Sequence, residues 1–165
     1  MPVLKPQRAG VDGIKDTLAE MSRLVNAASV NPLIRKQAMQ AISHCASSDR
    51  TCQQASILSW VQRQMVFIRD PYGVEALHDP VMIALAIEKR KQPYGDCDDF
   101  SMYLAALMRA VGLKASFKVV GFNGGNLSHV YVVGAKGERL DGTRNPWRMS
   151  AGEMLPETSG FIWEF

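Results

Sequence analysis

One amphipathic run, from Phe100 to Val111, constrains the fold of this chain more than any other part of its sequence. Its apolar residues recur at steps of three and four, which predicts a central, well-buried helix, and Gly112 stands where a left-handed C-terminal cap is expected. The segment Gly95-Asp96-Cys97-Asp98-Asp99 precedes this run, so a lone cysteine lies where a loop becomes a helix. Unpaired N–H groups and the positive end of the helix dipole favour a thiolate and a bound oxyanion there.

The three carboxylates beside Cys97 are better explained as a helix cap and dipole partners than as catalysts. Because negative charge opposes the ionisation of a neighbouring thiol, a positive group is needed to compensate. His129, inside the strand-like run Leu127–Val133, is the candidate for that group. The alternative for His129 is a strand histidine whose ring is satisfied structurally. His44 and His78 have no partner motif and are interpreted as structural.

The next strand-like run ends at Leu140-Asp141-Gly142 and supplies a third candidate. Cysteine, histidine and aspartate in this order are the minimum set for a thiol nucleophile, its base and the group that orients the base. A three-residue hairpin loop, Ala135-Lys136-Gly137, pairs Tyr131 with Asp141 and makes His129 its diagonal neighbour, roughly 7 to 8 Å away between backbones. A two-residue turn would place them on opposite faces. The alternative for Asp141 is turn chemistry before glycine.

Helical patterns come first in the chain and strand patterns last, which predicts an α+β fold with the cysteine-bearing helix on an antiparallel sheet. The predicted helix starts are Asp12, Asn31-Pro32, Thr51 with Gln54 as a capping box, and Asp79-Pro80. The predicted strands are 115–120, 127–133 and 138–140.

The length of 165 residues suits a single domain, residues 1–165, in which residues 1–50 form an arm and helices. No apolar run approaches the ~18 residues of a membrane span. The N-terminus lacks a hydrophobic segment with a small-residue cleavage site, so we expect a cytoplasmic or otherwise signal-independent location. Net charge is +3, and Lys and Arg are scattered, which argues against nucleic acid and membrane partners.

Cys45 and Cys52 flank a polar corner between two helical patterns. A disulfide across that corner is geometrically feasible, but a chain without a visible signal normally meets a reducing compartment, so two reduced thiols are the preferred interpretation. A metal site from His44, Cys45 and Cys52 lacks a fourth ligand and a recognised zinc spacing. We therefore expect no metal.

From about Trp60 to Trp147, a little over half of the chain, the sequence resembles the transglutaminase-like branch of the papain-fold cysteine enzymes. The resemblance is carried by a lead-in before Asp70-Pro71, then by Gly95–Phe100, Ser128–Val132 and Leu140–Thr143 in that order. It implies a catalytic core over residues 51–165, with Cys97 as nucleophile, His129 as base and Asp141 as its orienting carboxylate. It also implies acyl transfer at an amide without a cofactor. Members of the family hydrolyse peptides, deamidate, cross-link or do no chemistry.

An oxyanion hole in such an enzyme needs donors aimed at the developing charge. The backbone N–H of Cys97 is the natural first donor, and the side chain of Gln92 is the second candidate. The loop Gly121–Asn126 is interpreted as a rim of the cleft, with an ordinary hairpin connection as the alternative.

The expected partner is a protein or peptide substrate. The rival hypothesis is a structural or assembly module on the same fold, for example in a larger particle such as a virion. Its contact points would be Lys5 and Arg8 in the N-terminal arm and the aromatic C-terminal tail. The aromatic residues of that tail are Trp147, Phe161, Trp163 and Phe165.

Overall fold

The fold is α+β, as the sequence predicts. A computed structural model describes residues 3–6, 10–71, 74–143 and 157–165. The elements in chain order are β1 (Val3–Pro6), α1 (Gly10–Ser29), α2 (Pro32–Ala41), α3 (Arg50–Gln64), β2 (Val66–Phe67), β3 (Val74–Leu77), α4 (Pro80–Glu88), β4 (Tyr94–Gly95), α5 (Cys97–Ala110), β5 (Ser116–Phe122), β6 (Leu127–Val133), β7 (Arg139–Leu140) and β8 (Glu157–Trp163).

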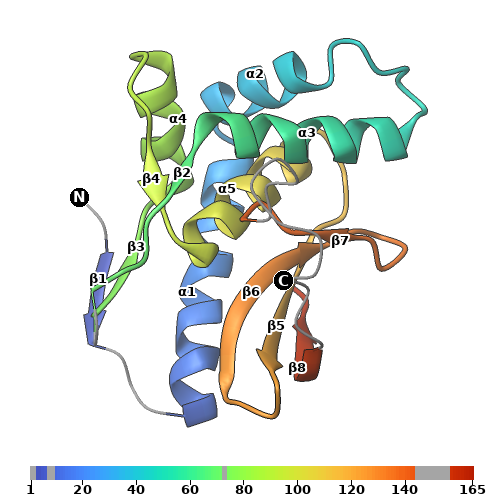
Figure 1. Cartoon of the computed structure of the whole chain (residues 1–165). Coiled ribbons are helices and arrows are strands. Elements are labelled where there is room, and N and C mark those ends of the chain that lie inside the picture. The colour runs from blue at the N-terminus through green and yellow to red at the C-terminus, as the bar shows by residue number, and fades with distance from the viewer. Residues whose placement is uncertain (1–2, 7–9, 72–73, 144–156) are drawn as a thin grey trace.

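Helix α5 is the centre of the molecule (Figure 1). It contacts all four other helices as well as β6 of the antiparallel sheet, whose strand order is β7-β6-β5-β8. Every residue from Asp99 to Met108 is buried. Burial on all sides explains why this helix is almost entirely apolar between Phe100 and Met108, and it fixes the position of the helix start.

Local signals define both ends of α5. Asp96 is the N-cap, and its carboxylate accepts the N–H of Asp98 at 3.1 Å. At the other end Gly112 adopts φ 76°, a left-handed conformation that favours glycine. The predicted cap and stop are confirmed.

The sheet packs on α5 through one face of β6. Val130 and Val132 belong to the same buried cluster as α5, and the Ser101 hydroxyl donates to the carbonyl of Val130 at 3.2 Å. Because side chains alternate along a strand, Tyr131 belongs to the other face of β6, where it packs with Val120 and Val133.

The hairpin from β6 to β7 has the predicted register. Val132 pairs with Leu140, and the N–H of Gly134 donates to the carbonyl of Glu138 at 3.0 Å. Gly137 has φ 83°, so the three-residue loop ends in a left-handed glycine. Asp141 therefore follows β7 in the position opposite Tyr131.

Two predicted helix starts are wrong in detail. Asp49, not Thr51, caps α3, and its carboxylate accepts the N–H of Cys52 at 2.9 Å. Aspartate is the better cap, and it stands three residues before the donor, so the capping box is not needed. Helix α1 begins at Gly10, which places Asp12 in its first turn instead of at its cap. The caps at Asn31 and Asp79 are confirmed.

Strand β8 was not predicted. It adds to β5 at the edge of the sheet, with Phe117 opposite Trp163. Beyond it, Phe165 stacks on Phe117 at 4.5 Å between ring centroids. The described part of the aromatic tail thus covers apolar surface, while Trp147 lies outside the described residues. The N-terminal arm also pairs as a strand, β1 with β3.

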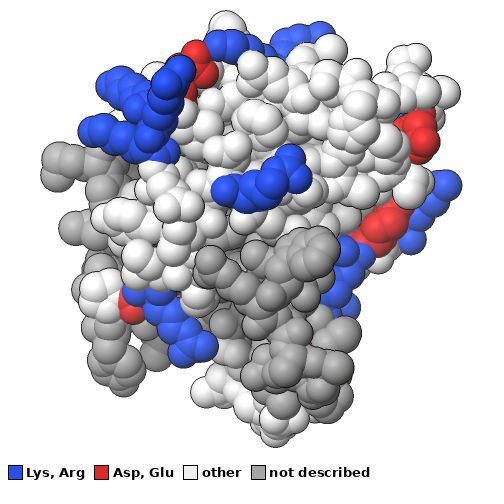
Figure 2. All heavy atoms as spheres, turned by 45° about the horizontal axis from the view of Figure 1, so that its top comes forward, with Lys and Arg blue, Asp and Glu red and all other residues white. Residues whose placement is uncertain are grey.

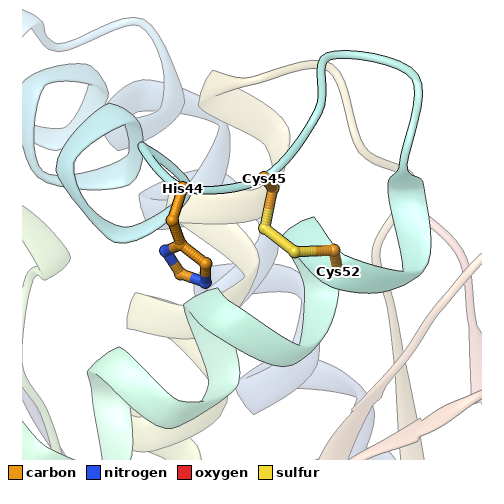
Figure 3. A group of neighbouring side chains, drawn as sticks. All are labelled: His44, Cys45 and Cys52. Atoms are coloured by element: carbon orange, nitrogen blue, oxygen red, sulfur yellow. A yellow bond between two sulfur atoms is a disulfide. The ribbon is translucent and has the colours of Figure 1, made fainter.

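Cys45 and Cys52 form a disulfide, contrary to the preferred interpretation of two reduced thiols (Figure 3). Helix α3 starts close to the end of α2, so the Cα atoms of Cys45 and Cys52 lie 5.8 Å apart. This separation is within the range found for disulfide-bonded cysteines. The sulfurs are joined to each other and do not form a metal site with His44. The His44 ring instead lies 3.1 Å from the Ser56 hydroxyl.

Figure 2 shows Lys and Arg side chains on several parts of the visible face, with a group of them at its upper left. Among the described helices, none combines the length and apolar character required to span a membrane.

Removal of the disulfide is expected to destabilise the fold. A cross-link across seven positions is worth about 2 kcal/mol, because it restricts the unfolded chain. Urea unfolding with and without a reductant measures the effect. The double variant Cys45→Ala/Cys52→Ala is the control, since its unfolding midpoint should not respond to reductant. Equal midpoints for the oxidised and reduced wild type would contradict the prediction.

Candidate active site

Three separate elements supply the candidate residues. Cys97 is the first residue of α5, His129 lies in β6, and Asp141 directly follows β7. Cys97 is half-buried, and its sulfur is not part of a disulfide. The register of the β6–β7 hairpin puts His129 and Asp141 on the same face of the sheet, diagonal to each other.

His129 and Asp141 are in direct contact. The Nε2 atom of His129 lies 2.8 Å from Oδ2 of Asp141, and the two side chains are 15% and 4% exposed. An ionised carboxylate accepts a hydrogen bond, so Nε2 carries the hydrogen and the neutral ring keeps its lone pair on Nδ1. This is the tautomer that a base needs if it is to take a proton through Nδ1.

Several groups hold the Asp141 carboxylate in place. Its Oδ1 accepts the Thr143 hydroxyl at 2.7 Å and the Thr143 N–H at 3.2 Å, and Arg139 lies 3.3 Å from Oδ2. Burial acts to raise the pKa of Asp141, but bonds and charge from His129, together with Thr143 and Arg139, outweigh it and hold the pKa at about 2. The carboxylate is therefore fixed in the ionised form that orients His129.

The turn after Asp141 packs tightly on α5. A Cβ added to Gly142 would lie 3.1 Å from the ring of Phe100 and 3.5 Å from Val61. Glycine allows this approach, which brings the Asp141 turn against the first turn of the helix that carries Cys97. Among the described residues, the short strand β7 pairs with β6 only at Val132 and Val133. The edge of β6 beside His129 is therefore not covered by β7.

Cys97 and His129 line the same cavity, which has a volume of about 720 Å³. Its other walls come from Asp96 and Asp98 at the start of α5, from β5 and β6, and from the part of α1 between Gly13 and Arg23, where Lys15 and Ser22 are not among the lining residues. The Cys97 thiol donates to Oδ1 of Asp98 at 3.7 Å. The structure thus brings the nucleophile and base candidates to one concave site, and Asp141 joins them through His129.

Asp99 has a separate role. It is fully buried and accepts the N–H of His78 at 2.7 Å, and its other oxygen lies 2.8 Å from the His78 ring. This hydrogen bond is the main reason why the pKa of His78 is raised, against the effect of burial. A side chain at Gly95 would collide with the Asp99 carboxylate, which explains the glycine there. Asp99 and His78 join α5 to the end of β3, as a structural pair.

Two other predicted features lie outside the cavity. Gln92 is exposed between α4 and β4 and does not line the cavity, so the structure does not bring it to Cys97. The Gly121–Asn126 loop does not line it either. The N–H of Gly125 donates to the carbonyl of Phe122 at 2.8 Å, which describes the ordinary hairpin connection weighed as the alternative.

Some residues of the site were missed. Arg139 stands two residues before Asp141, and strand alternation alone could have placed both on one face. The sequence of α1 shows only the apolar stripe of a packed helix, so its place in the cavity wall could not be predicted.

Asp96, Cys97 and Asp98 carry potential metal-ligand atoms that lie within 4.8 Å of one another. The spacing of these three residues in the sequence is not one that is typical of zinc sites. Asp96 is the cap of α5 and Asp98 lies in its first turn, which explains both carboxylates without a metal.

Comparisons with known proteins support the fold. No family model matches the chain, and no curated protein matches it. The chain is similar to a solved structure described as a putative cysteine protease from Cytophaga hutchinsonii, with a TM-score of 0.51 and 15% sequence identity. The similarity covers 95% of this chain but 53% of that protein, so this chain spans about half its length. The chain therefore shares a cysteine-protease-like fold.

Asp141→Asn is expected to lower the free energy of unfolding by about 2 kcal/mol at neutral pH. The reason is that the folded protein holds the pKa of Asp141 at about 2, below its ordinary value of 3.8. A lowered carboxyl pKa stabilises the fold above the ordinary value, and this contribution is lost as the pH falls through about 2.

The difference between wild type and Asp141→Asn should therefore shrink between about pH 4 and pH 2. Calorimetric unfolding across that range measures it. Asp12→Asn, an exposed position on α1, is the matched control and should follow the wild type. A difference that stays constant over the range would show that the Asp141 charge does not stabilise the fold.

Proposed function

We propose that this protein is a cysteine-dependent acyl-transfer enzyme of the transglutaminase-like kind, which acts at amide bonds and most simply as a peptidase or amidase. The observation that carries the proposal is the His129–Asp141 contact of 2.8 Å beside a cavity that Cys97 also lines. Nucleophile, base and orienting carboxylate are then the three members of a triad. The shared cysteine-protease-like fold supports the same class of chemistry by analogy.

The proposed reaction has two steps. His129 takes the proton of the Cys97 thiol, the sulfur forms a bond to the amide carbonyl carbon, and the carbon–nitrogen bond breaks as the amine leaves with that proton. The acyl group is now a thioester on Cys97. Water, or an amine in a transamidation, then attacks the thioester carbon and gives up a proton to His129. The carbon–sulfur bond breaks, the carboxylic acid or the new amide leaves, and His129 returns the proton to the Cys97 sulfur, which restores the thiol.

In this proposal the start of α5 stabilises the negative charge that develops on the carbonyl oxygen of the substrate. The Cys97 backbone N–H lies in the first turn of α5, where the helix dipole is positive, and is the proposed oxyanion donor. Gln92 is not a donor in this arrangement because it lies outside the cavity.

The proposal predicts that iodoacetamide alkylates Cys97 at neutral pH at least about tenfold faster in the wild type than in His129→Asn, since a positioned base contributes at least that much to proton removal. Intact-mass spectrometry of the oxidised protein follows this reaction, and the Cys45–Cys52 disulfide keeps the other two sulfurs out of the measurement. Cleavage of a mixed peptide library should disappear in Cys97→Ala.

His44→Asn is the matched control, because that ring contacts Ser56 outside the cavity and should not affect the alkylation rate. If His129→Asn reacts as fast as the wild type, His129 is not the base. The assembly module on the same fold would then be the better hypothesis.

A further inference from the structure

A guanidinium group lies between the triad carboxylate and the edge strand of the sheet. Arg139 in β7 has its Nη2 atom 3.3 Å from Oδ2 of Asp141, and its Nη1 atom pairs with Oε1 of Glu157 in β8. The Arg139 side chain is 27% exposed, and its guanidinium carbon lies 4.2 Å from the centre of the Tyr131 ring. The cation is therefore divided between two carboxylates that belong to different strands.

This division is not the arrangement that a purely structural ion pair favours. Arginine binds a carboxylate most strongly through two parallel hydrogen bonds, and Glu157 has two oxygens to offer. In the structure Glu157 also accepts the Tyr131 hydroxyl at 3.0 Å and the Lys118 ammonium at 3.0 Å. Among the described residues, the buried Nε atom of Arg139 has no hydrogen-bond partner. Arg139 thus gives up a bidentate bond to Glu157, and its other terminal nitrogen contacts Asp141.

The Oδ2 atom of Asp141 is shared by two groups. His129 Nε2 lies 2.8 Å from this oxygen, and Arg139 Nη2 lies 3.3 Å from it. A carboxylate beside an imidazole favours the charged imidazolium, and a cation on the same carboxylate weakens that preference. Arginine stays charged at any pH at which the protein is folded. Arg139 therefore places a constant positive charge next to the His129–Asp141 pair.

We infer that Arg139 is a positioning residue of the proposed triad. By sharing Asp141 with His129, it sets the pH range in which Cys97 reacts. Glu157 opposes this effect, because it holds the guanidinium from the side of β8 and brings a negative charge of its own. The inference rests on the proposed function and adds to it a residue that acts through His129.

Other charged and titratable groups surround His129, and the test leaves them in place. Lys118 and Tyr131 belong to the network described above, and from α3 the neutral side chain of Gln62 donates to the Asp141 carbonyl at 3.5 Å. The groups that line the same cavity from α5 and α1 are Cys97, Asp96, Asp98, Asp16, Glu20 and Arg23. A difference between variants therefore reports the one charge that has been removed.

The pH dependence of Cys97 alkylation by iodoacetamide tests the inference. The measured quantity is the pH at which the rate is half-maximal, which belongs to the coupled Cys97–His129 pair. Removal of a positive charge raises the pKa of neighbouring groups, so Arg139→Gln should move this pH upward by about half a unit or more. Removal of a negative charge has the opposite effect, so Glu157→Gln should move it downward by about 0.2 units or more. A general loosening of the sheet would act in the same direction in both variants.

Two further variants isolate the charge of Arg139. Arg139→Lys keeps the charge, so its half-maximal pH should stay closer to that of the wild type than to that of Arg139→Gln. Lys114→Gln is the matched control, because it removes a positive charge from an exposed pair with Glu164, outside the cavity, and should follow the wild type. Thermal midpoints verify folding, and Glu157→Gln carries the test if Arg139→Gln does not fold.

A double variant shows whether Arg139 acts through the histidine. In the His129→Asn background, addition of Arg139→Gln should shift the half-maximal pH by about half as much or less, because the ring that transmits the effect is gone.

The outcomes separate this inference from the proposed function. Unchanged profiles in Arg139→Gln and Glu157→Gln, or shifts in the same direction, would overturn the inference. A full Arg139→Gln shift in the absence of the His129 ring would overturn it as well. Slower alkylation in His129→Asn would leave the proposed function in place in each of these cases. Alkylation that does not respond to His129→Asn would instead overturn the proposed function.

Discussion

The burial of α5 on every side is the constraint on which the rest of the structure depends. Four helices and the sheet contact it, and Asp99 at its start is fully buried in a pair with His78. A buried carboxylate that lost its partner would be costly, so this pair fixes how the first turn sits against β3. Cys97 is two residues from Asp99, so its position follows from that of the helix.

The strand side of the site depends on register in the same way. A side chain changes face with each residue along a strand, so a one-residue slip in the β6–β7 hairpin would separate His129 from Asp141. The left-handed Gly137 and the three-residue loop prevent that slip. The network beyond them includes Arg139, whose guanidinium contacts Glu157 of β8 and lies over the Tyr131 ring. The outermost strand thus helps to hold the carboxylate that orients the histidine.

What the sequence predicted and what it missed have a common physical explanation. The α5 pattern, the caps at Asn31 and Asp79, and the hairpin register depend on neighbours in the chain, and they could be read from periodicity and turn chemistry. The disulfide, the His78–Asp99 pair, the α1 wall and strand β8 depend on segments that meet only after folding. Thr51 and Gln54 have capping-box spacing, but the cap in the structure is Asp49, two residues earlier, which the pattern does not include. The roles of Cys97, His129 and Asp141 stay predictions, although the geometry of the last two is now explicit.

A buried hydroxyl links the last strand to the helix that walls the cavity. The indole N–H of Trp163 in β8 donates to the Ser22 hydroxyl at 3.0 Å, and Ser22 itself donates to the Leu18 carbonyl within α1. Leu18 and Met21 line the cavity on the same stretch of helix. The width of the cleft is therefore set in part by β8, the edge strand opposite β7 in the sheet order, so a change in the position of β8 would alter which ligands fit without touching Cys97 or His129.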